Sequence, residues 1–119
     1  MAITKTARTL KTSASLAAAA SVNATEWDLT AAVSGTATVR LTNGATAPTT
    51  APTVRFFIGE ATGKKYLLYT ATGDTVNNSV TDIPCRFNRD TMFANITVIN
   101  GATNAITVEA FGEELTTAA

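Results

Sequence analysis

The sequence contains no histidine and a single cysteine, and both shortages limit the chemistry that the chain can perform. Without histidine it lacks the usual general base, the imidazole of a catalytic triad and the commonest zinc ligand. The lone Cys85 cannot form an internal disulfide or a metal cluster, and we interpret it as a small buried thiol. We therefore expect no enzyme activity, no catalytic residue, no cofactor and no metal site.

Charged residues and long apolar runs are also scarce. Only 15% of the residues are charged, and the formal net charge is zero. Because phosphate contacts need an excess of Lys and Arg, nucleic acid is not an expected partner. No apolar run approaches the ~20 residues that span a bilayer, so a membrane is not expected either. Residues 1–24 imitate a secretory signal, but the apolar centre is short and mostly alanine, and we do not expect a cleaved leader.

Thr (24 residues) and Ala (22 residues) are abundant instead. Thr favours strands, and Ala packs where two sheets or two subunits come close. Turn signals roughly every 8 to 15 residues separate short strand patterns, and no helical pattern lies between them. We predict one all-β domain: an antiparallel β-sandwich, Ig-like or jelly-roll-like, of about seven to eight strands with an extended N-terminal arm. A small barrel is the alternative.

Residues 53–70 predict a β-hairpin, because two runs rich in aromatic and β-branched residues flank a turn at residues 59–64. Successive side chains of a strand alternate between its two faces. Both faces of the first strand therefore carry apolar groups, as expected in the middle of a sandwich or at a subunit interface. One face has Val54, Phe56 and Ile58, and the other has Arg55 and Phe57.

Other segments show weaker strand patterns. The clearest covers residues 36–42, where Ala37, Val39 and Leu41 are expected to face inward. Trp27 is the expected core anchor of a short strand at residues 25–30. Further strands are expected at residues 80–83, 92–99 and 105–111; Pro84 must leave the first of these at a sheet edge, and residues 86–90 are expected to form a polar connection.

The chain divides into three predicted parts. Residues 1–22 form an N-terminal arm or edge strand, residues 23–115 the sandwich domain, and residues 116–119 a mobile tail. The first 25 residues hold three positive charges and no acid, whereas the rest holds six basic and nine acidic groups. Two explanations stay open: the arm lies on an acidic surface of a neighbouring copy, or its cations only keep an exposed end soluble.

Three groups of residues resemble sites, and each has a simpler explanation. Glu26 and Asp28 lie roughly 6.6 Å apart along a strand, near the carboxylate spacing of inverting glycosidases, but they also fit the polar face of an amphipathic strand. A calcium site would use loop oxygens that equally well bond their own backbone. A sugar-stacking platform would use rings that more often pack in a core. The calcium candidates are Asp74, Asn77, Asn78 and Asp82, and the platform candidates are Trp27, Tyr66 and Tyr69.

Four segments resemble small β-sandwich structural proteins of tailed-phage virions: residues 1–10, 27–30, 41–49 and 106–110. The resemblance rests on turn and strand consensus, so no catalytic residue can be transferred. It implies a capsid decoration, or cement, protein on the virion surface, made in the host cytoplasm. Such a protein binds the outside of an assembled head, contacts the major capsid protein and clusters with copies of itself, as a trimer or dimer.

A structural virion protein is therefore our leading hypothesis, with a tail or head-fibre component as a variant. On this hypothesis the arm becomes ordered only in the assembly. The alternative is a carbohydrate-binding module or an adhesin or pilin-like module, for which the three rings of the platform should lie exposed in one row. The candidate interface residues are Lys5, Arg8, Leu10, Lys11, Phe57 and Tyr69.

Overall fold

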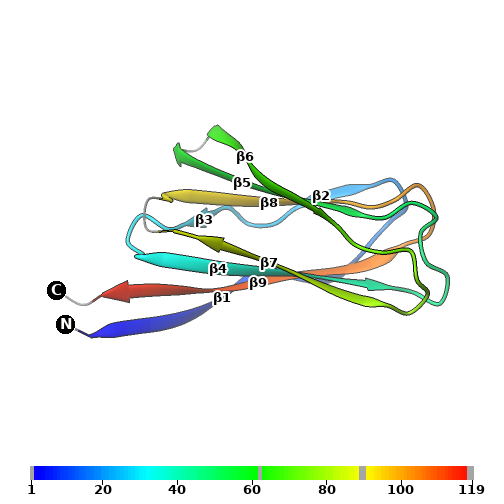
Figure 1. Ribbon diagram of the computed structural model, residues 1–119, viewed down its shortest axis with the longest axis horizontal. Coiled ribbons are helices and arrows are strands. Elements are labelled where there is room, and N and C mark those ends of the chain that lie inside the picture. The colour runs from blue at the N-terminus through cyan, green and yellow to red at the C-terminus, as the bar shows by residue number, and fades with distance from the viewer. Residues whose placement is uncertain (1, 62, 89–90, 118–119) are drawn as a thin grey trace.

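The computed structural model describes residues 2–61, 63–88 and 91–117, and these residues form two antiparallel sheets that pack face to face (Figure 1). The strands are β1 (Ile3–Leu16), β2 (Ser21–Asn23), β3 (Trp27–Asp28), β4 (Ser34–Asn43), β5 (Thr53–Ala61), β6 (Lys64–Thr72), β7 (Val80–Phe87), β8 (Phe93–Ile99) and β9 (Ile106–Thr117). The four-stranded sheet has the order β1-β9-β4-β7. The five-stranded sheet has the order β2-β8-β5-β6, with β3 also paired to β8.

The predicted all-β sandwich is confirmed, since the described residues form nine strands and no helix. The count exceeds the prediction because β2 and β3 are separate pieces, of three and two residues, that both pair with β8. In the described part of the chain, no helix is long and apolar enough to cross a membrane.

The core lies between the sheets and is filled by the inward side of each alternating strand. The inward residues predicted for the clearest strand, Ala37, Val39 and Leu41, are all buried. Trp27 is buried as expected, and its ring meets Phe87 edge to face with centroids 6.0 Å apart. Edge-to-face aromatic pairs add to the stabilisation that comes from burial alone.

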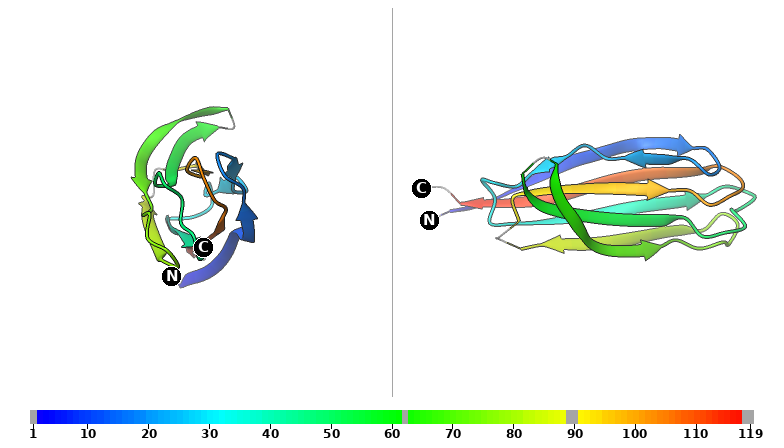
Figure 2. Two further views of the ribbon diagram at one scale, coloured as in Figure 1. Left: turned by 90° about the vertical axis from the view of Figure 1, so that its right-hand side faces the viewer. Right: turned by 90° about the horizontal axis from the view of Figure 1, so that it is seen from above.

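The sequence left residues 1–22 as either an extended arm or an edge strand. Residues 3–16 of this segment form β1, which is an edge strand. It pairs with β9 along its length, from Ile3 opposite Thr117 to Leu16 opposite Ile106, with two irregularities. The start of β1 and the end of β9 therefore lie at the same end of the molecule (Figures 1 and 2). Leu10 and Leu16 contribute to the core. The expectation of an arm that is ordered only in an assembly is thus corrected.

Strand β9 continues beyond the end that the sequence predicted. Residues 112–117 pair with β1, and Glu114 is buried and forms an ion pair with Arg8 of that strand. Thr116 and Thr117, predicted to belong to a mobile tail, lie in the strand, while residues 118–119 fall outside the described residues. Gly112 permits this continuation, since a Cβ there would lie 2.8 Å from the Trp27 ring.

Strand β7 also extends further than predicted. The edge position required by Pro84 is confirmed, because β7 is the last strand of its sheet. Arg86 and Phe87, expected in a polar connection, belong to this strand, and Phe87 is buried in the core. Because its neighbours Arg86 and Asn88 are polar, the sequence around Phe87 resembles a loop rather than a strand. Residues 89–90 of the predicted connection lie outside the described residues.

Candidate interaction surface

Strand β6 carries a run of exposed apolar side chains. It is the outermost strand of the five-stranded sheet and pairs with β5. Four successive side chains on it are about half exposed: Tyr66 62%, Leu67 48%, Leu68 44% and Tyr69 48%. An edge of this kind can bind another chain, because a partner can hydrogen-bond the unpaired backbone N–H and C=O groups and cover the apolar side chains. We call Lys64–Thr72 with these four side chains the β6 edge.

Apolar side chains lie on both faces of β6, because successive side chains alternate, and a β-bulge interrupts this alternation in the middle of the strand. Phe56 of β5 lies opposite Tyr69, but the register then shifts, so that Phe57 lies opposite Leu67. Leu68 is the extra residue of the bulge. Tyr69 stacks on the buried ring of Phe56, with centroids 5.9 Å apart and planes at 24°. The β6 edge is therefore continuous with the core on one face and with the outer surface of the sheet on the other.

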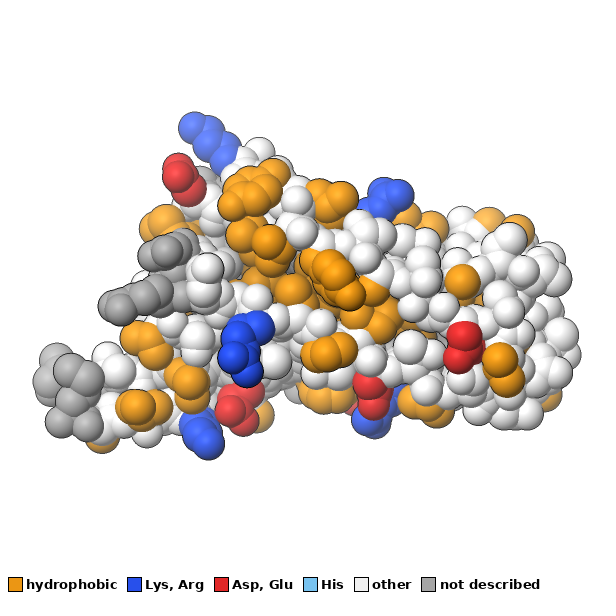
Figure 3. Space-filling model, viewed as in Figure 1, with side chains coloured by type: hydrophobic (Ala, Val, Ile, Leu, Met, Phe, Trp, Pro, Cys, Tyr) orange, Lys and Arg blue, Asp and Glu red, His pale blue; other side chains and the backbone are white. Residues whose placement is uncertain are grey.

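Figure 3 shows this apolar surface as a band of hydrophobic side chains over β6 and toward β7, with the charged side chains at its margins. Val80, at the start of β7, is also 55% exposed. The four β6 side chains together expose on the order of 400 Å², which is the size of a functional patch on a typical monomer. The band is thus large enough to be an interaction surface.

Charged side chains lie at both ends of the β6 edge. Lys64 and Lys65 begin the strand, and Lys65 forms an ion pair with Glu26. Asp74 follows the end of the strand. Its carboxylate accepts hydrogen bonds from the Ser79 hydroxyl at 2.6 Å and from the Val76 N–H at 3.1 Å. These donors hold the pKa of Asp74 below its usual value.

We expect the stability that Asp74 contributes to depend on pH. Because its pKa is lowered in the folded chain, the contribution is fully present above the unfolded pKa of about 3.9 and is lost as the pH falls through the folded pKa. Wild type should therefore be more stable than the Asp74→Asn variant at pH 7, and the difference should vanish at low pH. Urea unfolding of both proteins across this range measures it. A difference that stays constant with pH would contradict the assignment.

The N-terminal candidates lie on β1, at an edge of the other sheet. Lys5 is exposed, and Arg8 is exposed but is paired with Glu114. Lys11 is half-buried. Leu10 is only 5% exposed and packs in the core. Its prediction as an interface residue is thus corrected, since a core side chain cannot reach a partner.

Of the predicted contact residues, Tyr69 lies on the β6 edge and Phe57 lies beside it. Leu67 and Leu68 were not among the predicted contact residues. The preceding residues, Lys64 and Lys65, held a usable signal, since lysines are common on edge strands.

The candidate acidic side chains form hydrogen bonds or ion pairs with separate partners and do not converge on one site. Asp28 accepts hydrogen bonds from the hydroxyl and the N–H of Thr30, which lower its pKa. Asp82 pairs with Arg40 across the sheet at 2.8 Å, and this bond likewise lowers the Asp82 pKa. Among the described residues, no group of three or more Cys, Asp or Glu side chains could hold a metal ion.

The three rings of the predicted sugar platform do not form one exposed row. Trp27 is 5% exposed and belongs to the core, so its prediction as a platform residue is wrong. Tyr66 and Tyr69 remain accessible on the β6 edge. Only these two rings could stack against a ligand, and they lie three residues apart on one strand.

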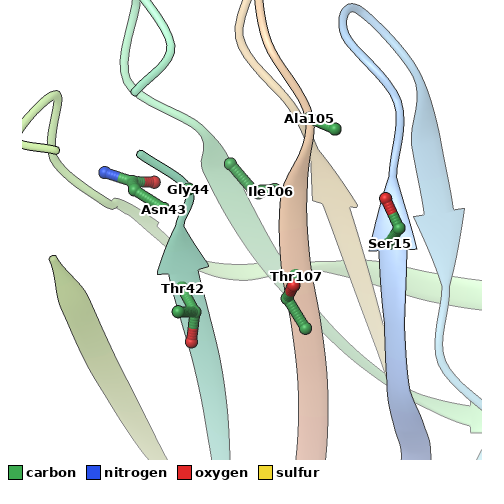
Figure 4. Close-up of a pocket in the computed structure, with 7 residues that line it drawn as sticks. All are labelled: Ser15, Thr42, Asn43, Gly44, Ala105, Ile106 and Thr107. Atoms are coloured by element: carbon green, nitrogen blue, oxygen red, sulfur yellow. The ribbon is translucent and has the colours of Figure 1, made fainter. Parts of the chain in front are cut away.

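A pocket of about 310 Å³ lies where β1 and β4 end and β9 begins (Figure 4). Its lining contains hydroxyl, amide and apolar groups but no charged side chain. The Asn43 amide is already engaged, since it donates to the carboxylate of Asp74 and to the carbonyl of Val76. The pocket therefore lacks the convergent polar groups of a specific ligand site. Its lining residues are Ser15, Thr42, Asn43, Gly44, Ala105, Ile106 and Thr107.

Comparison with known proteins adds information on the fold. No protein-family model and no curated protein sequence matches the chain. Among solved structures, a chain from the disulfide-linked pili that form Bacillus endospore appendages is similar, with a TM-score of 0.59, 16% identity and coverage of 98% of this chain and 89% of that one. A carbohydrate-binding module of the β-sandwich superfamily is also similar, with a TM-score of 0.51, 10% identity and coverage of 91% of this chain. This chain spans 54% of the length of that second protein. At these identities the likeness is one of fold, and the fold is an antiparallel β-sandwich.

Proposed function

We propose that this protein is a structural component of a larger protein assembly, without enzymatic activity, and that the β6 edge joins it to that assembly. The observation that carries the proposal is the run of four half-exposed apolar side chains on an edge strand. Adding a strand to such an edge supplies main-chain hydrogen bonds, and covering the side chains supplies hydrophobic free energy. Neither contribution requires a reactive group.

Within this class we propose a capsid decoration protein, located on the virion surface and bound to the major capsid protein and to other copies of itself. The support is the resemblance of four segments to phage virion proteins together with the low charge of the chain. Few charges keep the desolvation cost of a broad interface low. A shell also presents many identical sites, so contacts that are weak one at a time gain avidity.

Exposed Tyr66 and Tyr69 favour a second candidate, a carbohydrate-binding or adhesin module. Tyrosine rings can stack on sugar faces while their hydroxyls stay in water. With Trp27 buried, this candidate has two rings instead of three. Binding to a glycan array that is lost in the Tyr66→Ala/Tyr69→Ala variant would support it over the assembly function.

Co-sedimentation with heads built from the major capsid protein of the same phage genome tests the proposed function. Wild type should pellet with the heads. The Leu67→Lys/Leu68→Lys variant should bind at least about tenfold more weakly, because two charges would enter an apolar contact. Ile3→Lys is the control, since Ile3 is at least as exposed but lies on β1, in the other sheet.

Two outcomes would contradict the proposal. Wild type could fail to pellet with the heads, or the double variant could bind as tightly as Ile3→Lys. Because the substituted leucines are half exposed, both variants should fold, and a urea unfolding curve checks this directly.

A further inference from the structure

We infer that the partner of the β6 edge is the β6 edge of a second copy: the two strands pair antiparallel about a two-fold axis near Leu67 and Leu68. This inference rests on the proposed function and names the partner at the same surface. Pairing in this way joins two five-stranded sheets into one continuous sheet across the dimer.

The order of residues along β6 suits a two-fold contact, in which each copy offers the same surface and the surface must complement itself. The apolar residues occupy the centre of the strand, the lysines its start and threonines its end. In the antiparallel arrangement Lys64 and Lys65 of one copy face residues 70–72 of the other. Like charges opposite each other would be destabilising, and this arrangement keeps them apart. A parallel arrangement in register would place lysine against lysine.

The charges that flank the strand also favour this arrangement. Asp74 lies two residues beyond the end of β6, so the start of one strand approaches the Asp74 of the other copy. Lys64 and Asp74 thus attract each other across the dimer, and the symmetry repeats the attraction at both ends. Asp74 stays ionised near neutral pH, because the donors around it stabilise its carboxylate.

The exposed area predicts how strong the association is. Two copies contribute on the order of 800 Å² of apolar side-chain surface, below the total of about 1,600 Å² of a standard stable interface. We therefore expect a weak dimer in solution. On a lattice, where neighbouring copies are held close together, the same contact becomes effective through avidity.

Another edge strand of the sandwich, β1, fits the β6 edge less well. It carries Lys5, Arg8 and Lys11, and these cations would meet Lys64 and Lys65 of β6. Ile3 is the only large apolar side chain of β1 that is exposed among the described residues. Pairing of β1 with β6 would leave the four apolar side chains of β6 largely uncovered.

Cysteine cross-linking tests the two-fold contact. In a Cys85→Ser background, Leu68→Cys places one thiol near the axis, and oxidised glutathione should link two copies into a covalent dimer. Ile3→Cys is the control, because its thiol would be at least as exposed but would lie on β1, in the other sheet. We expect the dimer yield of Leu68→Cys to be many times that of Ile3→Cys. Equal yields would overturn the inference.

Sedimentation equilibrium of unmodified protein provides a second measurement. The average mass of wild type should rise with concentration, whereas Leu67→Lys/Leu68→Lys should remain a monomer. A wild type that stays monomeric at every concentration and gives no cross-link would overturn the inference. If that variant nevertheless lost binding to heads, the proposed function would stand with the shell itself as the partner. A dimer that never binds heads would overturn the proposed function alone.

Discussion

Replacing Phe56 with alanine is expected to lower the free energy of unfolding by about 3–5 kcal/mol. Phe56 is fully buried, stacks on Tyr69, and has its ring centroid 6.4 Å from that of Phe87. Its loss leaves a cavity between the sheets and removes the ring on which Tyr69 of the β6 edge stacks. Since small domains are stable by only about 5–15 kcal/mol, the loss is a large share of the total. Urea unfolding followed by Trp27 fluorescence measures it.

Phe57→Ala is the matched control, because it makes the same chemical change one residue away. Phe57 points to the outer face of the sheet and is half-buried. Its replacement leaves no enclosed cavity, so the cost should be well under half of that for Phe56. Equal losses for the two variants would show that the core is not organised around Phe56. Phe57 also borders the β6 edge, opposite Leu67, so the same variant can be tested in the dimer experiments.

Gly101→Ala is expected to destabilise the protein by about 2–3 kcal/mol through overpacking. A Cβ at Gly101 would lie 1.9 Å from the carbonyl oxygen of Thr50 and 2.8 Å from its hydroxyl. Backbone cannot rotate away as a side chain can, so the loop that contains Thr50 must move. That movement would also break the hydrogen bond that the Ala102 N–H donates to the Thr50 hydroxyl. Thermal unfolding measures the cost.

The chain supplies its own control for this substitution, because the sequence Asn-Gly-Ala-Thr occurs twice, at residues 43–46 and 100–103. Around Gly44 the nearest atom to an added Cβ is the carbonyl oxygen of Ala105, at 4.0 Å. Gly44→Ala should therefore be neutral or stabilise the protein by about 0.5 kcal/mol, since alanine restricts the unfolded chain. Equal destabilisation by the two substitutions would contradict the packing around Gly101.

The asparagine side chain plays the same structural role in both copies of this turn. Asn43 and Asn100 are both buried, and each donates through its side-chain amide to backbone carbonyls of other segments. Asn100 donates to Leu16 and so ties the end of β1 to the end of β8. The recurrence indicates similar turn chemistry at two strand ends. It does not indicate that the asparagines bridge loops, because their acceptors are distant in sequence.

Local alternation was a reliable guide wherever one face of a strand is buried and the other is not. It correctly predicted the inward residues of β4. It was less reliable where polar residues are buried or apolar ones exposed. Glu114 is buried because Arg8 of a strand more than a hundred residues away neutralises it. No pattern within β9 reveals that partner.

The order of residues alone determined that this chain forms strands, that it has no histidine, and which side chains of β4 face the core. These properties follow from composition and from the two-residue period of a strand, which are local. Pro84 had already placed one strand at an edge, but only the tertiary structure decided that β6 lies at another. An edge is defined by the absence of a neighbour, and that depends on how all nine strands of the described chain are ordered. The same apolar run would have been core in a central strand, and on β6 it became a surface.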